Sequence, residues 1–291
     1  MTRKLYTILC IFLITFSLPC IAFAEYNRII SLSPSLTEIL YALDVQDKIV
    51  GVTKYCKFPP QAQDKTIVGG MLDPNFEVIY SLEPDLILYH KGTTGQQDRL
   101  KQLGIDVLET ESRSVKGILE SIQLIGDKIQ RQKQSKELLG KIEEKIKAVK
   151  AQGKGKEKPR VLLTYFRPIA TGDIREVYIA GNHTYFNDLI ELAGGVNAFQ
   201  GSKSITSPVV SAEGILEMDP DVIIEIKGTI KATQHTKEEM LRDWESLSFL
   251  KAYQNHRIYI LTEEYIGIPG PRLVLTLMDM AECIHPEIKW E

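Results

Sequence analysis

The sequence predicts an α/β fold of two Rossmann-like lobes, each with a central parallel sheet, joined by one long helix. Two observations carry this prediction: an internal repeat of a short helix followed by an apolar strand, and one long helical stretch between the repeats. Strands that alternate with helices are typical of a parallel sheet covered by helices. The 291 residues, of which 44% are hydrophobic and 25% charged, suffice for one large or two small globular domains.

The clearest repeat pairs residues 77–88 with residues 213–224. In both copies a glutamate, Glu77 or Glu213, stands seven residues before a Pro-Asp pair, and an apolar run follows. A residue that favours the N-cap precedes each copy, and a proline cannot continue a helix without losing a hydrogen bond. We therefore expect helices that begin beside Asn75 and Ser211 and end before Pro84 and Pro220, followed by buried strands over residues 86–89 and 222–226.

A weaker repeat and a helical linker complete the predicted architecture. Residues 36–43 resemble residues 185–193, and both are helical in period and follow a strand-like run. Residues 135–152 contain no proline, and their apolar residues recur at helical spacing. The expected segments are a signal peptide (1–24), an N-terminal lobe (25–134), a linker helix (135–153) and a C-terminal lobe (154–291).

The first segment has the features of a secretory signal. Arg3 and Lys4 precede an apolar run, and Ala22-Phe-Ala24 is a small-x-small cleavage site. We expect cleavage after Ala24 and export to the periplasm. The alternatives are an uncleaved membrane anchor, for which the apolar run is short, and a lipoprotein processed at Cys20, which lacks the expected small residue before the cysteine.

Charge and motifs exclude several functional classes. A net charge of −3 excludes a generally basic nucleic-acid binder. The chain lacks the G-x-S-x-G, G-x-x-x-x-G-K-[ST] and G-x-G-x-x-G motifs, and its five histidines form no metal-binding spacing. Cys56 and Cys283 remain after signal removal, and their pairing in an oxidising compartment stays open. Two lobes suit a binding protein that closes on a ligand in the cleft between them.

Ligands of open parallel sheets bind beyond the carboxyl ends of the strands. The loops that follow the expected strands therefore supply the candidate cleft residues. These loops include Ser33-Pro-Ser35, residues 53–60, His90-Lys-Gly92, Phe166-Arg-Pro168, Ser207-Pro208, Lys227-Gly228 and Glu264-Tyr-Ile-Gly267.

Several stretches resemble one family. They are residues 28–38 (RIISLSPSLTE), 50–62 (VGVTKYCKFPPQA), 68–70 (VGG) and 187–195 (NDLIELAGG), with Pro271-Arg-Leu273 and His285-Pro-Glu287. Together they are similar to the helical-backbone (class III) periplasmic substrate-binding proteins of ABC importers, which carry cobalamin, haem and ferric siderophores. The resemblance covers essentially the whole chain after the signal segment and is strongest to the cobalamin-binding branch.

The resemblance implies roles for individual residues. Glu77 and Glu213 match the glutamates that dock, one per lobe, onto arginines of the ABC permease. Tyr55 matches a cleft tyrosine that packs on the corrin, and His90 stands where the cobalamin branch can carry tryptophan. The full set of implied ligand-binding residues is Tyr55, Met71, His90, Tyr165, Phe166, Arg167, Ser207, Glu264 and Tyr265. Ser207, where an aromatic is common, and Ile268, where an arginine can stand, depart from the cobalamin pattern.

The resulting hypothesis is a monomeric, non-enzymatic binding protein that captures a corrinoid (cobalamin) and delivers it to an ABC importer. It needs no cofactor of its own and binds no nucleic acid. A haem or ferric-siderophore binder of the same class is the alternative, and in the haem case His90 or Tyr55 would ligate the iron. From another class, a secreted metal-dependent enzyme would have to assemble a site from scattered groups such as His90, His183 and Glu264.

Overall fold

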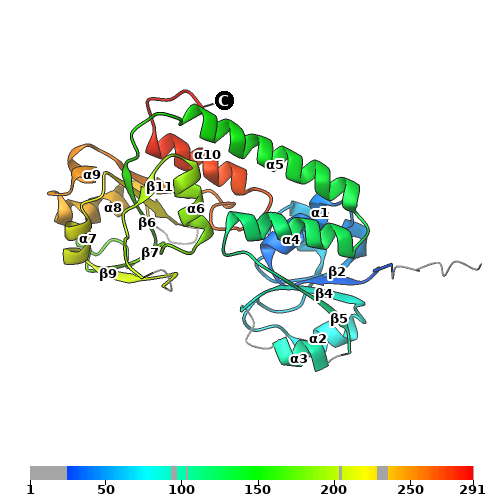
Figure 1. The fold of residues 1–291 in the computed structure, drawn as a ribbon. Helices are drawn as coiled ribbons and strands as arrows, with labels where there is room; N and C mark the ends of the chain where they lie inside the picture. Colours follow the sequence, from blue (N-terminus) through cyan, green and yellow to red (C-terminus); the bar gives the residue numbers. More distant parts are fainter. Residues whose placement is uncertain (1–24, 93–96, 103, 203–204, 228–234, 291) are drawn as a thin grey trace, which may run out of the picture.

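The structure is a computed structural model that describes residues 25–92, 97–102, 104–202, 205–227 and 235–290. The predicted signal peptide and its cleavage site after Ala24 lie outside these residues. Two α/β lobes stand side by side, and the long helix α5 (Gln132–Gln152) runs along one side of both (Figure 1). No helix within the described part of the chain is long and apolar enough to cross a membrane.

The N-terminal lobe is built on a five-stranded, wholly parallel sheet in the order β3-β2-β1-β4-β5. Its strands are β1 (Ile29–Ser31), β2 (Ile49–Val52), β3 (Thr66–Ile67), β4 (Leu86–His90) and β5 (Asp106–Thr110). Its helices are α1 (Pro34–Ala42), α2 (Phe76–Ser81), α3 (Gln97–Gln102) and α4 (Val115–Lys128), with short 3₁₀ turns at Gln46–Lys48 and Pro60–Asp64. All residues of β1 and β4 are buried, as expected for central strands covered on both faces.

The C-terminal lobe holds a mixed sheet in the order β11-β10-β6-β7-β9, with the short β8 also paired to β6. The strands are β6 (Arg160–Phe166), β7 (Glu176–Ile179), β8 (Val196–Asn197), β9 (Val209–Ser211), β10 (Val222–Ile226) and β11 (Ile258–Leu261). The helices are α6 (Tyr185–Leu192), α7 (Ala212–Met218), α8 (Lys237–Asp243), α9 (Lys251–Gln254) and α10 (Leu273–Ile284), with a 3₁₀ turn at Trp244–Leu247.

The two-lobed α/β fold is confirmed, but the second sheet is only partly parallel. Strands β6, β10 and β11 run parallel, whereas β7 is antiparallel to both β6 and β9. The connection from β6 to β7 spans residues 167–175. It is shorter than the dozen or more residues that a parallel crossover requires, so the chain turns back instead.

The repeated helices begin and end as the sequence predicts. The Asn75 side chain accepts hydrogen bonds from the amides of Glu77 and Val78 at the start of α2. The Ser211 side chain accepts one from the Gly214 amide at the start of α7. Both helices end before the proline of their repeat, and buried strands follow. The helix α5 begins three residues before the expected Ser135, whose hydroxyl bonds to the Gln132 carbonyl inside the first turn.

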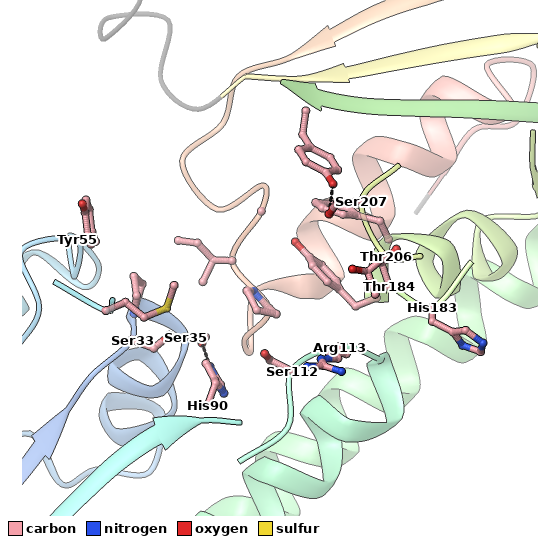
Figure 2. A pocket seen from close by; sticks show the side chains of 18 residues that line it. Ser33, Ser35, Tyr55, His90, Ser112, Arg113, His183, Thr184, Thr206 and Ser207 are labelled. Carbon is pink, nitrogen blue, oxygen red and sulfur yellow. Dashed lines mark hydrogen bonds between the residues drawn. The ribbon is translucent and has the colours of Figure 1, made fainter. Parts of the chain in front are cut away.

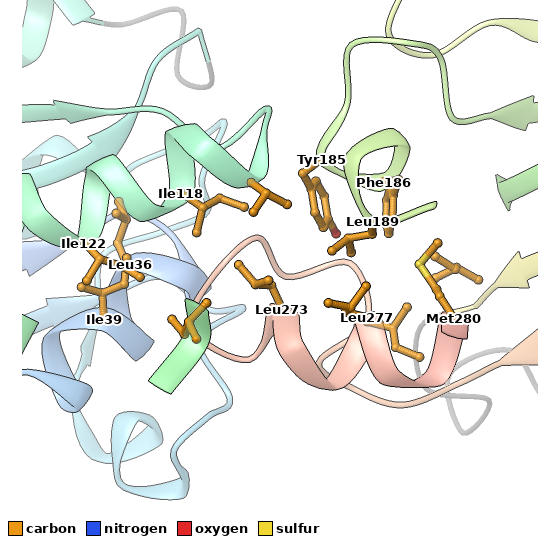
Figure 3. Close-up of a cluster of buried hydrophobic side chains, with 14 of the residues drawn as sticks. Leu36, Ile39, Ile118, Ile122, Tyr185, Phe186, Leu189, Leu273, Leu277 and Met280 are labelled. Atoms are coloured by element: carbon orange, nitrogen blue, oxygen red, sulfur yellow. The ribbon is translucent and has the colours of Figure 1, made fainter. Parts of the chain in front are cut away.

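A single hydrophobic core crosses from one lobe to the other. Figure 3 shows apolar side chains of the N-terminal lobe and of α6 meeting along α10. The labelled members are Leu36, Ile39, Ile118, Ile122, Tyr185, Phe186, Leu189, Leu273, Leu277 and Met280. The lobes are therefore joined by packed side chains as well as by α5. Cys56 and Cys283 are both buried and both free, so they do not pair.

Candidate ligand-binding site

A cavity of about 520 Å³ lies between the lobes, where the predicted cleft would be (Figure 2). Its walls come from the ends of β4 and β6, from the segments that follow β1, β2, β3 and β5, from the start of α6, and from the segments that precede β9 and α10. The lining residues are Ser33, Pro34, Ser35, Tyr55, Met71, His90, Ser112, Arg113, Tyr165, His183, Thr184, Tyr185, Phe186, Thr206, Ser207, Gly267, Ile268 and Pro269. This position agrees with the rule that ligands bind beyond the carboxyl ends of parallel strands.

Five of the nine expected ligand-binding residues line this cavity: Tyr55, Met71, His90, Tyr165 and Ser207. They come from both lobes, and Figure 2 shows Tyr55 on one side of the cavity and Ser207 on the other. Tyr55 is 55% exposed, and the Lys54 ammonium lies 5.3 Å from the centre of its ring.

The structure corrects the expectation for Arg167. Its guanidinium is buried inside the C-terminal lobe, 3.0 Å from the Glu225 carboxylate and 2.6 Å from the Asp243 carboxylate. Arg167 holds the interior of this lobe together and does not line the cavity between the lobes. The strand-end position alone did not reveal these two partners, which lie far along the chain.

Three further expected residues, Phe166, Glu264 and Tyr265, also lie outside the cavity lining. Phe166 follows Tyr165 in β6, and successive strand residues point to opposite faces, so its ring packs edge-on against Tyr178 instead. The Tyr265 hydroxyl donates to Asp279 on α10, at 2.7 Å. Glu264 is exposed on the same loop, whose residues 267–269 reach the cavity instead.

An aromatic wall faces the cavity from the C-terminal lobe. The rings of Tyr185 and Phe186 are stacked with centroids 4.2 Å apart, and the Tyr165 ring lies 6.4 Å from that of Phe186 at 19°. Burial raises the pKa of the Tyr185 and Tyr165 hydroxyls, so both phenols stay neutral at pH 7. The Tyr165 hydroxyl donates to Ser207. Such a wall is rigid, because its rings have few rotatable bonds, and its exposed area is limited, since Tyr185 and Phe186 are 8% and 9% exposed.

The opposite lobe contributes a polar floor around His90, which is 4% exposed. Its Nε2 lies 2.7 Å from the Ser35 hydroxyl and its Nδ1 lies 2.8 Å from the Thr110 hydroxyl. The Ser33 and Ser35 hydroxyls are 2.9 Å apart. Burial lowers the pKa of His90 to about 4, so the imidazole is neutral at pH 7.

The lining of the cavity carries few charged side chains. Among the described lining residues, Arg113 is the one side chain of lysine or arginine type and no carboxylate is present. Arg113 and its neighbour Ser112 escaped prediction, although they follow β5 as the other loops follow their strands. Residues 184–186 at the start of α6 and Thr206 were also missed. In the ranges that the structure describes, no three His, Cys, Asp or Glu side chains gather as a metal site.

Glu77 and Glu213 lie outside the cavity lining, in the first turns of α2 and α7. Both side chains are exposed, and the two helices belong to different lobes (Figure 1). The internal repeat therefore gives each lobe an equivalent exposed carboxylate.

Comparisons with known proteins agree with this geometry. The family model for the periplasmic binding protein matches residues 29–265. A Bacillus subtilis (strain 168) protein named as an uncharacterized ABC transporter substrate-binding lipoprotein, YvrC, is 30% identical over 90% of this chain and 81% of its own length. The vitamin B12-binding protein of Vibrio cholerae (strain ATCC 39541) is 30% identical over 84% of each chain.

Solved structures share the fold over 90% of this chain. A possible iron-binding (periplasmic solute-binding) protein from Staphylococcus epidermidis matches with a TM-score of 0.75 at 28% identity, over its full length. The S. aureus protein IsdE, solved with heme, gives 0.73 at 25% identity, also over its full length. The vitamin B12-binding protein of Vibrio cholerae gives 0.77 at 24% identity over 98% of its chain.

The family match covers most of both lobes and every residue that lines the cavity except Gly267, Ile268 and Pro269. Members of this family are substrate-binding transport proteins rather than enzymes, and they work with the permease and ATPase components of ABC transporters. The similar proteins include a vitamin B12-binding protein, a protein solved with heme and a possible iron-binding protein, so the family alone leaves the substrate open. The chain belongs to the periplasmic binding protein family and is a substrate-binding protein of an ABC transporter.

Proposed function

We propose that this protein captures a corrinoid, with cobalamin as the representative ligand, and delivers it to the permease of an ABC importer. One observation carries the proposal: an exposed aromatic ring, Tyr55, and a stacked aromatic wall lie on opposite lobes of the same cavity. Rigid aromatic side chains on both sides suit a flat macrocycle, because they bury apolar area at little cost in side-chain entropy. The similarity to the vitamin B12-binding protein of Vibrio cholerae supports the same ligand class.

A haem-binding role is the second candidate. It is favoured by Tyr55 and His90, since phenolate and imidazole are ligands for haem iron, and both residues line the cavity. Against it, both ring nitrogens of His90 already bond to hydroxyls of the N-terminal lobe. An iron bond at His90 would have to break one of these buried hydrogen bonds.

Two other ligand or activity classes have weaker support. A catecholate siderophore carries several negative charges, whereas Arg113 is the one guanidinium among the described lining residues. A metal-dependent enzyme would need His90, His183 and Glu264 to converge, and Glu264 lies outside the cavity. Both classes therefore rank below the corrinoid and haem proposals.

Delivery would use the exposed carboxylates of Glu77 and Glu213, one on each lobe, as contacts for arginines of the permease. The core shared by the two lobes resists large rotations, so a small closure around the ligand would precede docking. We infer that the protein acts as a monomer in the periplasm, after removal of residues 1–24.

The direct test is calorimetric titration of the chain from residue 25 with cyanocobalamin, with hemin and a ferric catecholate siderophore in parallel. Tight one-to-one binding of cyanocobalamin alone is the expected result. Tight binding of hemin without binding of cyanocobalamin would overturn the corrinoid proposal and favour the haem alternative.

A further inference from the structure

Four side chains form a continuous hydrogen-bonded relay beneath one wall of the cavity. The relay runs from Ser33 to Ser35 (2.9 Å), from Ser35 to His90 Nε2 (2.7 Å) and from His90 Nδ1 to Thr110 (2.8 Å). All four residues are at least 96% buried, and all but Thr110 line the cavity. Figure 2 shows Ser33, Ser35 and His90 side by side at this wall, with the bond from Ser35 to His90 drawn. The relay therefore links the cavity surface to the interior of the sheet.

The inner end of the relay fixes the direction of its protons. The Thr110 hydroxyl lies 2.9 Å from the carbonyl oxygen of Tyr89, which can only accept. Because a hydroxyl has one proton, Thr110 donates it to Tyr89 and must accept from His90. The Nδ1 atom of His90 therefore carries a hydrogen.

The hydrogen on Nδ1 also determines which groups donate in the outer part of the relay, towards the cavity. A neutral imidazole has one N–H, so Nε2 is an acceptor and receives the proton of the Ser35 hydroxyl. The neutral form is the one that burial favours, since it holds the pKa of His90 near 4. Ser35 then has only lone pairs left for Ser33, and the Ser33 hydroxyl must donate to Ser35. The hydroxyl proton of Ser33 is consequently used in the hydrogen bond to Ser35 and is not available to a ligand.

We propose that Ser33 presents only acceptor lone pairs to the cavity, and that it thereby selects ligands with an N–H donor at this position over ligands with a carboxylate. A primary carboxamide would donate to Ser33, whereas a carboxylate would place its lone pairs against those of Ser33 in a site shielded from water. The inference deepens the corrinoid proposal and rests on it for the ligand. Corrinoids carry carboxamides around the macrocycle, whereas haem carries two carboxylates.

The direction of the relay is tested without any ligand. Protein labelled with ¹⁵N-histidine is examined at pH 7 by long-range ¹H–¹⁵N correlation NMR, with His90→Gln to assign the signal. The expected spectrum shows a neutral His90 with a hydrogen on Nδ1 and no hydrogen on Nε2. A His90 signal with hydrogen on Nε2 would overturn the inference, whatever the protein binds.

The selectivity is tested by titration with cyanocobalamin and with its monocarboxylic acids, in which one carboxamide has become a carboxylate. Wild-type protein should bind the amide at least about tenfold more tightly than the acid that places its carboxylate at Ser33. Ser33→Ala should lose most of this preference, and it should fold, because Ser33 makes no side-chain cap bond to α1. Ser81→Ala, which changes an exposed serine of α2 outside the cavity, should keep it.

The two experiments separate the possible failures. If Ser33→Ala keeps the full preference, the selective role of Ser33 is wrong even though the corrinoid proposal stands. If cyanocobalamin does not bind while the NMR spectrum shows hydrogen on Nδ1, the corrinoid proposal is overturned and the acceptor character of Ser33 stands.

Discussion

Arg272 forms a bidentate ion pair with Glu38 across the junction of the lobes, with N–O distances of 2.7 and 2.9 Å. Glu38 belongs to α1 in the N-terminal lobe, whereas Arg272 immediately precedes α10. The guanidinium also lies 3.8 Å from the centre of the Phe58 ring and 5.8 Å from that of Tyr265. The junction thus combines an apolar core with a shielded polar contact, and burial raises the pKa of Glu38 against the opposing effect of Arg272.

Removal of Arg272 should destabilise the protein strongly. In Arg272→Met the Glu38 side chain, which is 2% exposed, would keep a buried carboxylate without its partner. We expect a loss of about 3–5 kcal/mol in the free energy of unfolding, measured by urea denaturation. The double variant with Glu38→Met should recover much of this loss. Lys133→Met, which removes an exposed pair with Glu137, is the control and should change stability by less than about 0.5 kcal/mol. A loss below about 1 kcal/mol in Arg272→Met would contradict the role of the pair.

Prediction from the sequence was most accurate for features that depend on residues close together in the chain. Asn75 and Ser211 cap helices through amides two or three residues ahead, so their role could be read from the local pattern. The rule that ligands bind beyond the carboxyl ends of parallel strands predicted Tyr55 and His90 as cavity residues, because it depends only on the order of strands and loops. It missed Arg113 because no strand was expected over residues 106–110, since β5 carries polar residues and lacks the buried apolar run of the central strands.

The prediction for Arg167 was wrong for a physical reason. Whether a strand-end arginine turns into the cleft or into its own lobe depends on its carboxylate partners. Glu225 and Asp243 are 58 and 76 residues away, and no local pattern marks them as partners. The antiparallel strand β7 was not predicted for a related reason. The expected alternation of strands and helices was assumed to continue after β6, although the loop that follows is too short for a parallel crossover.

Tyr55 should contribute directly to ligand affinity. Replacement by alanine removes an exposed aromatic face from the cavity and should weaken cyanocobalamin binding about 10- to 100-fold in calorimetry. Tyr55→Phe keeps the ring and should bind within about threefold of wild type if the face, rather than the hydroxyl, makes the contact. Phe249→Ala removes an 83% exposed ring outside the cavity and serves as the control. Equal affinities for wild type and Tyr55→Ala would rule out this contact.

Glu77 and Glu213 should affect delivery without affecting capture. Arginine at both positions would repel the permease arginines that we propose as partners, so cyanocobalamin uptake in proteoliposomes holding the cognate transporter should be nearly abolished. Ligand affinity should stay at the wild-type value, because neither residue lines the cavity. The matched control is the double variant Glu137→Arg with Glu144→Arg on α5, which changes the net charge by the same amount at exposed sites away from both helices. Normal uptake by the double variant would refute docking through these glutamates.

His90 should make the stability of the protein depend on pH in the acidic range. Burial lowers its pKa from 6.5 to about 4, a shift that the nearby Glu111 carboxylate only partly opposes. Between these values the unfolded chain takes up a proton that the folded protein does not, so stability is intact above pH 6.5 and falls as the pH drops towards 4. This effect should contribute roughly 2 kcal/mol of the loss between pH 7 and pH 4.5, measured by urea denaturation.

The His90 contribution is isolated by comparing slopes rather than absolute stabilities. His90→Gln cannot titrate in this range, so its stability should fall with acidity by roughly 2 kcal/mol less than that of wild type, even if the lost hydrogen bonds lower it at every pH. His256→Asn removes an exposed histidine at a backbone position with φ of 53°, which asparagine tolerates, and should keep the wild-type slope. Parallel pH profiles for wild type and His90→Gln would mean that His90 does not stay neutral in the folded protein. The relay would then lack the bare Nε2 that turns the Ser33 proton inward.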